Sequence, residues 1–431
     1  MDVAPHKVET ITPRIALALS GGGFRASVFH LGLLRRLAEL GWLSRVDVLS
    51  TVSGGSIVGA FAVTRWEQWI HAGADGHAFD QVIAQPFLQR IQKGNFIVEW
   101  LLKSPLWPLR KAIDRQFTRT QAAAELIDRW FFDGLNCDQL PERPLLVLNA
   151  TSLHSIRSWR FTRGGLGDSR VGYSGWNGRP IPIALAVCAS ASFPPVFPPL
   201  RIRRGHYTFS GPSYGEPPLP DFDFIPLTDG GVYDNSGMEA LFKPTLLPGG
   251  TQVEKAQFLL VSDGGALPKY DFRSSGLPAI TEGLLLYRAD QIAREQVSAV
   301  RTRWLMEQIT TGRRQGLLVS LRSALERIGG REFEEYCTCV PGGCHIPTSL
   351  LAKVREIRTS LDRFTDVECN ALMYHAYLMT DCFLWRYRDT MAEEYQVPAN
   401  PAPSWQIEFS QETATRWDSE LSRSGRVLRL R

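Results

Sequence analysis

The chain of 431 residues is long for a single domain, and its formal net charge at pH 7 is only +4. Its 44% of apolar residues is enough to bury a large core, and its 21% of charged residues is ordinary for a globular protein. So small a charge argues against nucleic-acid binding, which needs a strongly basic domain or stripe.

The first fifty residues predict two strand–turn–helix units. Residues 14–20 form a short apolar run that ends in glycines, as a buried parallel strand does. Apolar residues then recur at three- and four-residue intervals from Val28 to Ala38, and Gly41 can end the resulting helix. A second apolar run, 46–52, leads through glycines into another helix. This order favours a parallel sheet flanked by helices.

The rest of the chain is expected to complete one large α/β unit. Two more apolar runs predict strands, and two long segments read as helix; these are 144–150 and 257–261, and 284–328 and 349–388. We expect a three-layer α/β/α core with a central, mostly parallel sheet over residues 10–270, with a helical insert at about 66–135 that forms a cap. A mainly helical part, 271–400, would pack on this core, and 401–431 would be a solvated basic tail.

The sequence predicts no secreted or membrane-spanning protein. The N-terminal residues lack the basic and apolar regions of a signal peptide, and no stretch reaches the roughly 18 to 20 uninterrupted apolar residues of a spanning helix. We therefore expect a cytoplasmic protein, peripheral at the inner face of the membrane. Aromatic and basic residues are mixed in 86–118, where Trp100 and Trp107 are candidates for a lipid interface. The alternative is an amphipathic helix that packs on the core.

One cysteine-rich segment was weighed as a metal site. It contains Cys337, Cys339, Cys344 and His345. The spacing could bind zinc, but the paired C-x2-C knuckles are missing, so a turn with reduced thiols is preferred. No metal and no cofactor is expected.

Ser53 is the strongest candidate for a nucleophile. It ends a predicted strand, Gly54 and Gly55 follow it, and a helix begins at once. That context is typical of a nucleophile elbow, a sharp turn that exposes the serine hydroxyl group. Thr51 stands where the usual G-x-S-x-G pattern has glycine, which weakens the match.

A glycine-rich turn follows the first predicted strand. It consists of Gly21, Gly22, Gly23, Phe24 and Arg25. Such a turn can direct several backbone amides at one point, as an oxyanion hole requires. The alternative is the phosphate cradle of a nucleotide-binding protein. No G-K-[ST] follows, however, and Ala26 replaces the last glycine of the dinucleotide motif.

Asp229 is the candidate partner of the serine. It follows an apolar run and precedes Gly230 and Gly231, so it is placed to orient or deprotonate a hydroxyl group. The block Asp263-Gly264-Gly265 follows another apolar run in the same manner. Asp-Gly pairs are also common in β-turns, so neither block is specific by itself.

In combination, these blocks resemble the patatin-like phospholipase family. The matching blocks are 21–25, 53–55, 189–195 (Ala-Ser-Ala-Ser-Phe-Pro-Pro) and 229–231, in the family's order within residues 14–265. The resemblance implies a Ser53–Asp229 dyad. In it, Ser53 forms an acyl-enzyme, Asp229 is the base, and the amides of 22–24 with Arg25 hold the oxyanion. None of the eight histidines has a triad-like context.

The resemblance also implies the substrate class. We expect a phospholipid or lysophospholipid at a membrane surface, and no nucleic acid. Three alternatives stay open: a signal-regulated effector that damages membranes, as in bacterial antiphage defence, a catalytically idle lipid-binding member, and a nucleotide-binding α/β protein. The oligomeric state and the head-group preference are not predicted.

Overall fold

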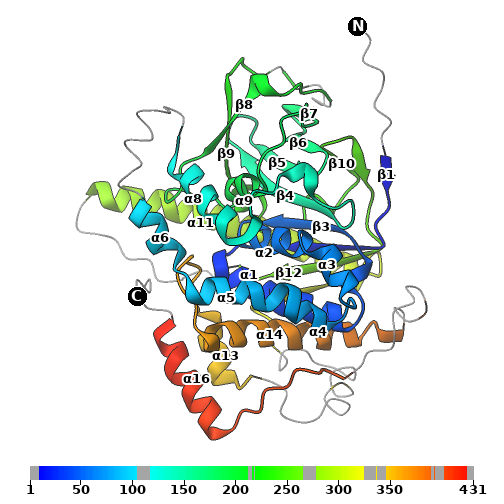
Figure 1. Cartoon of the computed structure of the whole chain (residues 1–431), viewed down its shortest axis with the longest axis vertical. Coiled ribbons are helices and arrows are strands. Elements are labelled where there is room, and N and C mark those ends of the chain that lie inside the picture. Colours follow the sequence, from blue (N-terminus) through cyan, green and yellow to red (C-terminus); the bar gives the residue numbers. More distant parts are fainter. Residues whose placement is uncertain are drawn as a thin grey trace.

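A ten-stranded sheet forms the centre of the molecule in the computed structural model (Figure 1). The structure describes residues 9–103, 117–211, 216–217, 219–265, 278–324, 336, 346–389, 393 and 402–424. The strands of the sheet are β2 (Ile15–Leu19), β3 (Val46–Val52), β4 (Leu145–Ser152), β5 (Arg157–Thr162), β6 (Gly165–Asp168), β7 (Gly172–Ser174), β8 (Leu200–Arg203), β9 (Phe224–Asp229), β12 (Phe258–Asp263) and β13 (Gln315–Ser320).

The sheet is mixed, with a parallel and an antiparallel half. Strands β13, β12, β2, β3 and β4 lie side by side and run parallel. From β4 onward, β5, β6 and β7 continue the sheet antiparallel, and β9 pairs antiparallel with both β4 and β8. The α/β class is confirmed, while the expected parallel order holds for the first half only. The antiparallel half comes from residues between 145 and 229 that the sequence patterns left largely unassigned.

The described helices surround this sheet. They are α1 (Gly23–Glu39), α2 (Gly54–Val63), α3 (Trp66–His71), α4 (Gly76–Phe79), α5 (Gln85–Lys93), α6 (Phe96–Lys103), α8 (Arg119–Ile127), α9 (Ile183–Ser190), α10 (Gly231–Asp234), α11 (Pro278–Thr310), α13 (Thr348–Arg355), α14 (Asp366–Trp385) and α16 (Gln411–Ser424). A separate three-stranded sheet contains β1 (Glu9–Ile11), β11 (Thr251–Val253) and β10 (Thr245–Leu247).

The two faces of the central sheet bury different partners, because successive side chains of a strand point to opposite faces. On β2, Leu17 belongs to the core shared with α1, α2, α9 and α14. The neighbouring Ala16 and Ala18 belong to a second core, with the segment 238–256 and the C-terminal end of α11. The structure thus has the three layers that were expected.

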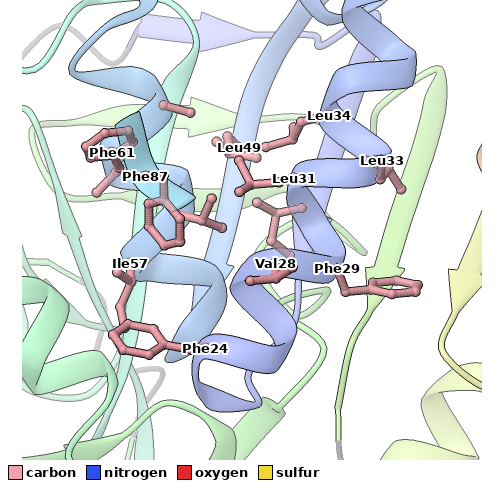
Figure 2. Close-up of a cluster of buried hydrophobic side chains, with 14 of the residues drawn as sticks. Phe24, Val28, Phe29, Leu31, Leu33, Leu34, Leu49, Ile57, Phe61 and Phe87 are labelled. Atoms are coloured by element: carbon pink, nitrogen blue, oxygen red, sulfur yellow. The ribbon is translucent and has the colours of Figure 1, made fainter. Parts of the chain in front are cut away.

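Helix α1 is packed on two sides. Figure 2 shows Val28 and Leu31 directed toward α2 and Leu49 of β3, while Phe29 points the opposite way. The Phe29 ring lies 6.0 Å from that of His375 on α14. Apolar contacts on both sides hold the start of α1 in place, which matters for the site below.

The predicted helix at 284–328 is wrong beyond Thr310. The chain turns at Gly312 (φ 69°), and the apolar run 315–320 pairs with β12 as the edge strand β13. Cross-strand pairing outweighs helix propensity here, because the run is short and buried on the sheet. Strand β13, from the part of the chain after residue 270, therefore joins the sheet of the core.

Two further helix predictions need correction. The expected helix 349–388 is two helices, α13 and α14, with the non-helical residues 356–365 between them. The expected solvated tail contains the helix α16, whose Trp417 and Leu421 are buried. These two residues are one helical turn apart, so they present one apolar side to the core. Among the described helices, none is long and apolar enough to cross a membrane.

Candidate active site

The ends of β3 and β9 meet on the same edge of β4. Strand β3 runs parallel to β4 up to the pair Val52–Asn149, and β9 pairs antiparallel with β4 from Asp229–Ala150 onward. Consecutive residues of β4 thus pair with two strands that arrive from opposite directions. This register brings Ser53, the residue after β3, next to Asp229.

Ser53 occupies a strained turn. Its φ of 50° and ψ of −117° lie in a region that residues other than glycine rarely adopt, and such strain concentrates at functional sites. Its carbonyl accepts the amides of Ser56 and Ile57 at 2.8 and 3.1 Å, which starts α2. The Ser53 hydroxyl group lies close enough to the Asp229 carboxylate to favour its ionised form and to lower its pKa. The turn therefore has the conformation of a nucleophile elbow.

Thr51, which replaces the usual glycine of the elbow, is buried and hydrogen-bonded. Its hydroxyl oxygen is 3.0 Å from that of Ser56 and donates to the Val147 carbonyl at 3.1 Å. Gly59 on α2 makes room for its methyl group, since a Cβ added at Gly59 would lie 2.7 Å from Thr51 Cγ2. The missing side chain at Gly59 thus compensates for the extra one at Thr51.

The glycine-rich turn lies directly against the elbow. A Cβ added at Gly21 would lie 3.1 Å from Ser53 Cβ, and one added at Gly54 would collide with the Gly23 carbonyl group. The Gly55 amide donates to the Ser20 carbonyl at 3.1 Å, which fastens the two turns together. Side chains at these glycines would push the turns apart.

Three backbone amides at the start of α1 are available to a ligand. The N–H groups of Gly22, Gly23 and Phe24 have no hydrogen-bond acceptor within the described residues. Amides at a helix N-terminus, together with the helix dipole, stabilise negative charge. The Gly21 amide does not belong to this set, because it donates to the Asn235 carbonyl at 2.9 Å.

The side chain of Arg25 is committed elsewhere, so its predicted contact with the oxyanion is corrected. Its guanidinium donates to the Gly264 carbonyl at 3.2 and 3.3 Å and to the Ile357 carbonyl at 2.9 Å. Burial lowers the pKa of Arg25 to about 10, against the opposing effect of nearby Asp263. Arg25 therefore ties the turn after β12 to the segment between α13 and α14.

Asp229 is a buried carboxylate with a raised pKa. The residue is 2% exposed, and this burial raises its pKa to about 6. The Gly231 amide, which donates to Oδ1 at 2.6 Å, acts in the opposite direction, as do the Ser53 hydroxyl group and the charge of Arg294. Such a group is mostly ionised at neutral pH and is a stronger base than an ordinary aspartate.

The segment 189–195 supports both members of the pair. The Ser190 hydroxyl group accepts the Ser53 N–H at 2.9 Å and donates to the Asn149 carbonyl at 2.5 Å. The Ser192 carbonyl accepts the Asp229 N–H at 3.2 Å. Sequence reasoning noted this segment as part of the family pattern but gave Ser190 and Ser192 no role.

Two further residues adjoin the site: Asn235, which follows the aspartate block closely enough in sequence to be a local hydrogen-bond partner, and Arg294, which the sequence did not indicate. Cβ atoms added at Gly231 and Gly265 would lie 2.6 and 3.0 Å from side-chain atoms of Asn235, so Asn235 lies between these two glycines. Arg294 belongs to α11, far from Asp229 in sequence. No local pattern marks this arginine, because α11 contains several others.

His30 is structural. One ring nitrogen lies 2.9 Å from the Ser20 carbonyl oxygen, and the other lies 2.7 Å from the Ser262 hydroxyl oxygen. Complete burial lowers the pKa of His30 to about 4, so the ring is neutral at physiological pH. Through its contact with the Ser20 carbonyl, His30 stabilises the start of the glycine-rich turn.

The predicted lipid-interface residues are only partly described. Trp100 is 8% exposed, donates to the Arg119 carbonyl at 3.1 Å and packs on Phe197, so the expectation that it faces a membrane is not met. The neighbouring Leu101 and Leu102 are exposed on α6. Trp107 and the cluster Cys337, Cys339, Cys344 and His345 lie outside the described residues.

A narrow apolar pocket opens beside the elbow. Its lining includes Ile57, one turn after Ser53, and Cys188 and Ala191, which flank Ser190 and Ser192. A larger cavity of about 650 Å³ surrounds β8 and the start of β9. That cavity lies at the opposite end of β9 from the Asp229 carboxylate, so the small pocket is the nearer of the two to Ser53.

The chain is similar to known proteins in sequence family and in fold. The model of the patatin-like phospholipase family matches residues 17–242, more than half of the chain. The human GIVD cytosolic phospholipase A2 has a similar fold, with a TM-score of 0.50 and 11% identity over 88% of this chain. The same human enzyme in complex with methyl gamma-linolenyl fluorophosphonate aligns with a TM-score of 0.48 and 13% identity over 89% of this chain.

The chain covers 62% of the human enzyme in the first of these alignments and 60% in the second. No curated protein sequence matches it. The extent of the family match, together with a sheet that brings the elbow, the glycine-rich turn and the aspartate block to one place, shows that the chain belongs to the patatin-like phospholipase family.

Proposed function

We propose that the protein is a lipid acyl hydrolase of the phospholipase A or lysophospholipase type, which acts through a Ser53–Asp229 dyad. One observation carries the proposal: a strained Ser53 lies beside a buried carboxylate with a raised pKa, and the serine hydroxyl group acts on that pKa. Membership of the family supports lipid hydrolysis as the general activity.

In the first half of the reaction, Asp229 takes the proton of the Ser53 hydroxyl group while Oγ attacks the ester carbonyl carbon. Negative charge then develops on the former carbonyl oxygen, where the N–H groups of Gly22, Gly23 and Phe24 stabilise it. The carbon–oxygen bond to the leaving alcohol breaks, and protonated Asp229 returns its proton to that alcohol. The product is an acyl-Ser53 ester.

In the second half, Asp229 accepts a proton from water, and the hydroxide attacks the acyl-Ser53 carbonyl carbon. The same amides stabilise the second oxyanion. The bond to Ser53 Oγ breaks, and Asp229 returns its proton to the serine. The free fatty acid leaves, so one residue acts as base and then acid in each half.

The small pocket beside the elbow has a volume of about 20 Å³ and would have to widen to admit an acyl chain. Its lining is almost entirely apolar, with Phe96, Ile127, Val187 and Phe197 among the residues. Burial of methylene groups in such a pocket stabilises the complex by about 0.8 kcal/mol for each group. We propose that the chain of the scissile ester enters here, which would place its carbonyl carbon near Ser53.

Contact with a membrane surface is the second part of the proposal. Leu101 and Leu102 are 49% and 73% exposed on α6, directly after the buried Trp100. Exposed leucines can enter the interfacial region of a bilayer, and the adjacent segment contains basic residues that suit anionic lipid. The substrate would then reach the dyad without crossing water.

Labelling with a fluorophosphonate tests the nucleophile independently of the substrate. Ser53→Ala should lose both labelling and release of fatty acid from a phospholipid. Ser56→Ala is the matched control, since Ser56 is a buried serine three residues further on, hydrogen-bonded to the same Ser190. If both variants keep their label, or both lose it with the fold intact, Ser53 is not the nucleophile.

Liposome binding tests the membrane contact. The double substitution Leu101→Ser/Leu102→Ser should weaken sedimentation with liposomes several-fold and leave hydrolysis of a soluble ester unchanged. Leu153→Ser/Ile156→Ser removes another exposed apolar pair, 48% and 70% exposed, in the turn after β4. Equal effects of the two double variants would refute a specific role of α6.

A further inference from the structure

An ion pair between α11 and the core holds Arg294 near Asp229. Arg301, about two helical turns further along α11, pairs with Asp234 at 3.0 Å. Asp234 belongs to α10, the short helix that follows Asp229. Arg294 lies on the same side of α11 as this anchor, and its guanidinium carbon is 4.8 Å from the centre of the Phe193 ring. Phe193 directly follows the serine whose carbonyl holds the Asp229 amide.

The guanidinium of Arg294 is only partly satisfied within the protein. One terminal nitrogen lies 2.5 Å from the carboxylate of Asp290 on the same helix, and 49% of the Asp290 side chain is exposed. Its Nε is buried and has no hydrogen-bond partner within the described part of the chain. A buried N–H without an acceptor is unfavourable, so a ligand that brings an acceptor gains binding energy here.

We infer that Arg294 binds the phosphate diester of a phospholipid whose ester carbonyl lies between Ser53 and the free amides of α1. The inference deepens the proposed function and rests on it. The planar fork of a guanidinium matches two phosphate oxygens, and such charge-assisted pairs are among the stronger hydrogen bonds in proteins. Asp290 is a weak competitor, because an ion pair between residues four apart on an open helix surface stabilises little.

The position of Arg294 explains why we assign phosphate binding to this residue and not to Arg25. Arg25, the cation expected from the sequence, is fully engaged by the carbonyls of Gly264 and Ile357. The charge of Arg294, by contrast, reaches the Asp229 carboxylate. A phosphate a few bonds from the scissile ester falls within reach of the same side chain. Neutral glycerides carry no such anion and leave the buried Nε unpaired.

The test compares two short-chain substrates that differ in the phosphate. Arg294→Gln should lower kcat/KM for dihexanoylphosphatidylcholine by about 10–100-fold and change that for dihexanoylglycerol by less than about threefold. Asp290→Asn should raise kcat/KM for the phospholipid a few-fold, because it removes the competing carboxylate. Arg288→Gln, on the same helix, is the control and should change neither. Equal losses on both substrates in Arg294→Gln would overturn the inference.

Binding without turnover separates this inference from the proposed chemistry. Ser53→Ala protein should bind a diether phosphatidylcholine, which has no ester, and Arg294→Gln in that background should weaken the binding at least tenfold by calorimetry. Unchanged binding would refute the role of Arg294, whatever the fate of the dyad. Hydrolysis that persists in Ser53→Ala would refute the dyad instead. Inorganic phosphate that binds Arg294 while the diether lipid does not would also refute a phospholipid site.

Discussion

The blocks Asp229-Gly230-Gly231 and Asp263-Gly264-Gly265 have the same sequence and the same local geometry. Each aspartate ends a strand, and each carboxylate accepts the N–H of the second glycine, at 2.6 and 2.9 Å. Their surroundings differ. Strand β9 meets the end of β3 head-on, whereas β12 lies between β2 and β13 and runs parallel to both.

This difference in strand direction separates the two roles. Asp229 faces the residue at the end of the opposing strand, which is the serine. Asp263 lies near the buried cation Arg25, and its negative charge raises the pKa of Arg25. The turn itself does not bring an aspartate next to a serine; the direction of the strand that ends opposite it does. Four experiments test whether the two aspartates differ in this way.

The largest effect is expected on activity. Asp229→Asn should lower kcat by about 10³-fold or more, because the serine loses its proton acceptor. Asp263→Asn keeps an acceptor for its glycine amide. It should retain activity within about tenfold, because the proposed general base, Asp229, is unchanged. Release of fatty acid from a phospholipid measures both. Comparable losses in the two variants would show that the blocks are not functionally distinct.

The free energy of unfolding should change in opposite directions in Asp229→Asn and in Asp263→Asn. At pH 8, Asp229→Asn should raise the free energy of unfolding by up to about 3 kcal/mol, because burial raises the pKa of Asp229 from 3.8 to about 6. A raised carboxylate pKa disfavours folding above pH 6, and this penalty vanishes below pH 4, where both states are protonated. Asp263→Asn should lower stability, because it removes a counter-charge from buried Arg25. Urea unfolding at pH 8 and pH 4 distinguishes these signs.

The pH profile gives a third, smaller effect. Below pH 6, kcat/KM should fall about tenfold for each pH unit, since protonated Asp229 cannot accept the serine proton. A neutral soluble ester avoids titration of the substrate. Asp263→Asn should keep this acidic limb unchanged. A limb that moves with Asp263, or one near pH 4 in the wild type, would contradict the assignment.

The smallest expected effect is that of chelation. EDTA should change activity by less than roughly twofold, because the proposed oxyanion stabilisation comes from backbone amides. A loss of activity that calcium restores would contradict this account of oxyanion stabilisation. The measurement uses purified protein and a soluble ester, so that effects of calcium on liposomes are avoided.

Much of the site could be predicted from the sequence. Ser53, the glycines around it and Asp229 all lie where a strand ends in a small-residue turn, and this pattern is visible within a few residues. The departures at Thr51 and Ala26 could not be judged in this way. Thr51 is tolerated because Gly59, eight residues on, leaves space for it.

Roles that depend on long-range partners were beyond the sequence. Arg25 follows three glycines and was expected to face the substrate, yet it binds carbonyls of residues 264 and 357. No local sequence motif identifies Arg294, yet its charge acts on Asp229. Trp100 lies in a segment whose mixture of aromatic and basic residues is typical of a membrane interface, but its ring packs against Phe197.

By itself, the sequence determined the local units: buried strands that lead into glycine turns and helices, and two identical aspartate turns. These depend on side-chain size, on permitted φ angles and on hydrogen bonds that span two or three residues. Contacts between distant segments determine which aspartate meets Ser53, that the run 315–320 is a strand, and which arginine acts on Asp229. Strand order and direction arise from pairing between distant segments, and no short pattern encodes them.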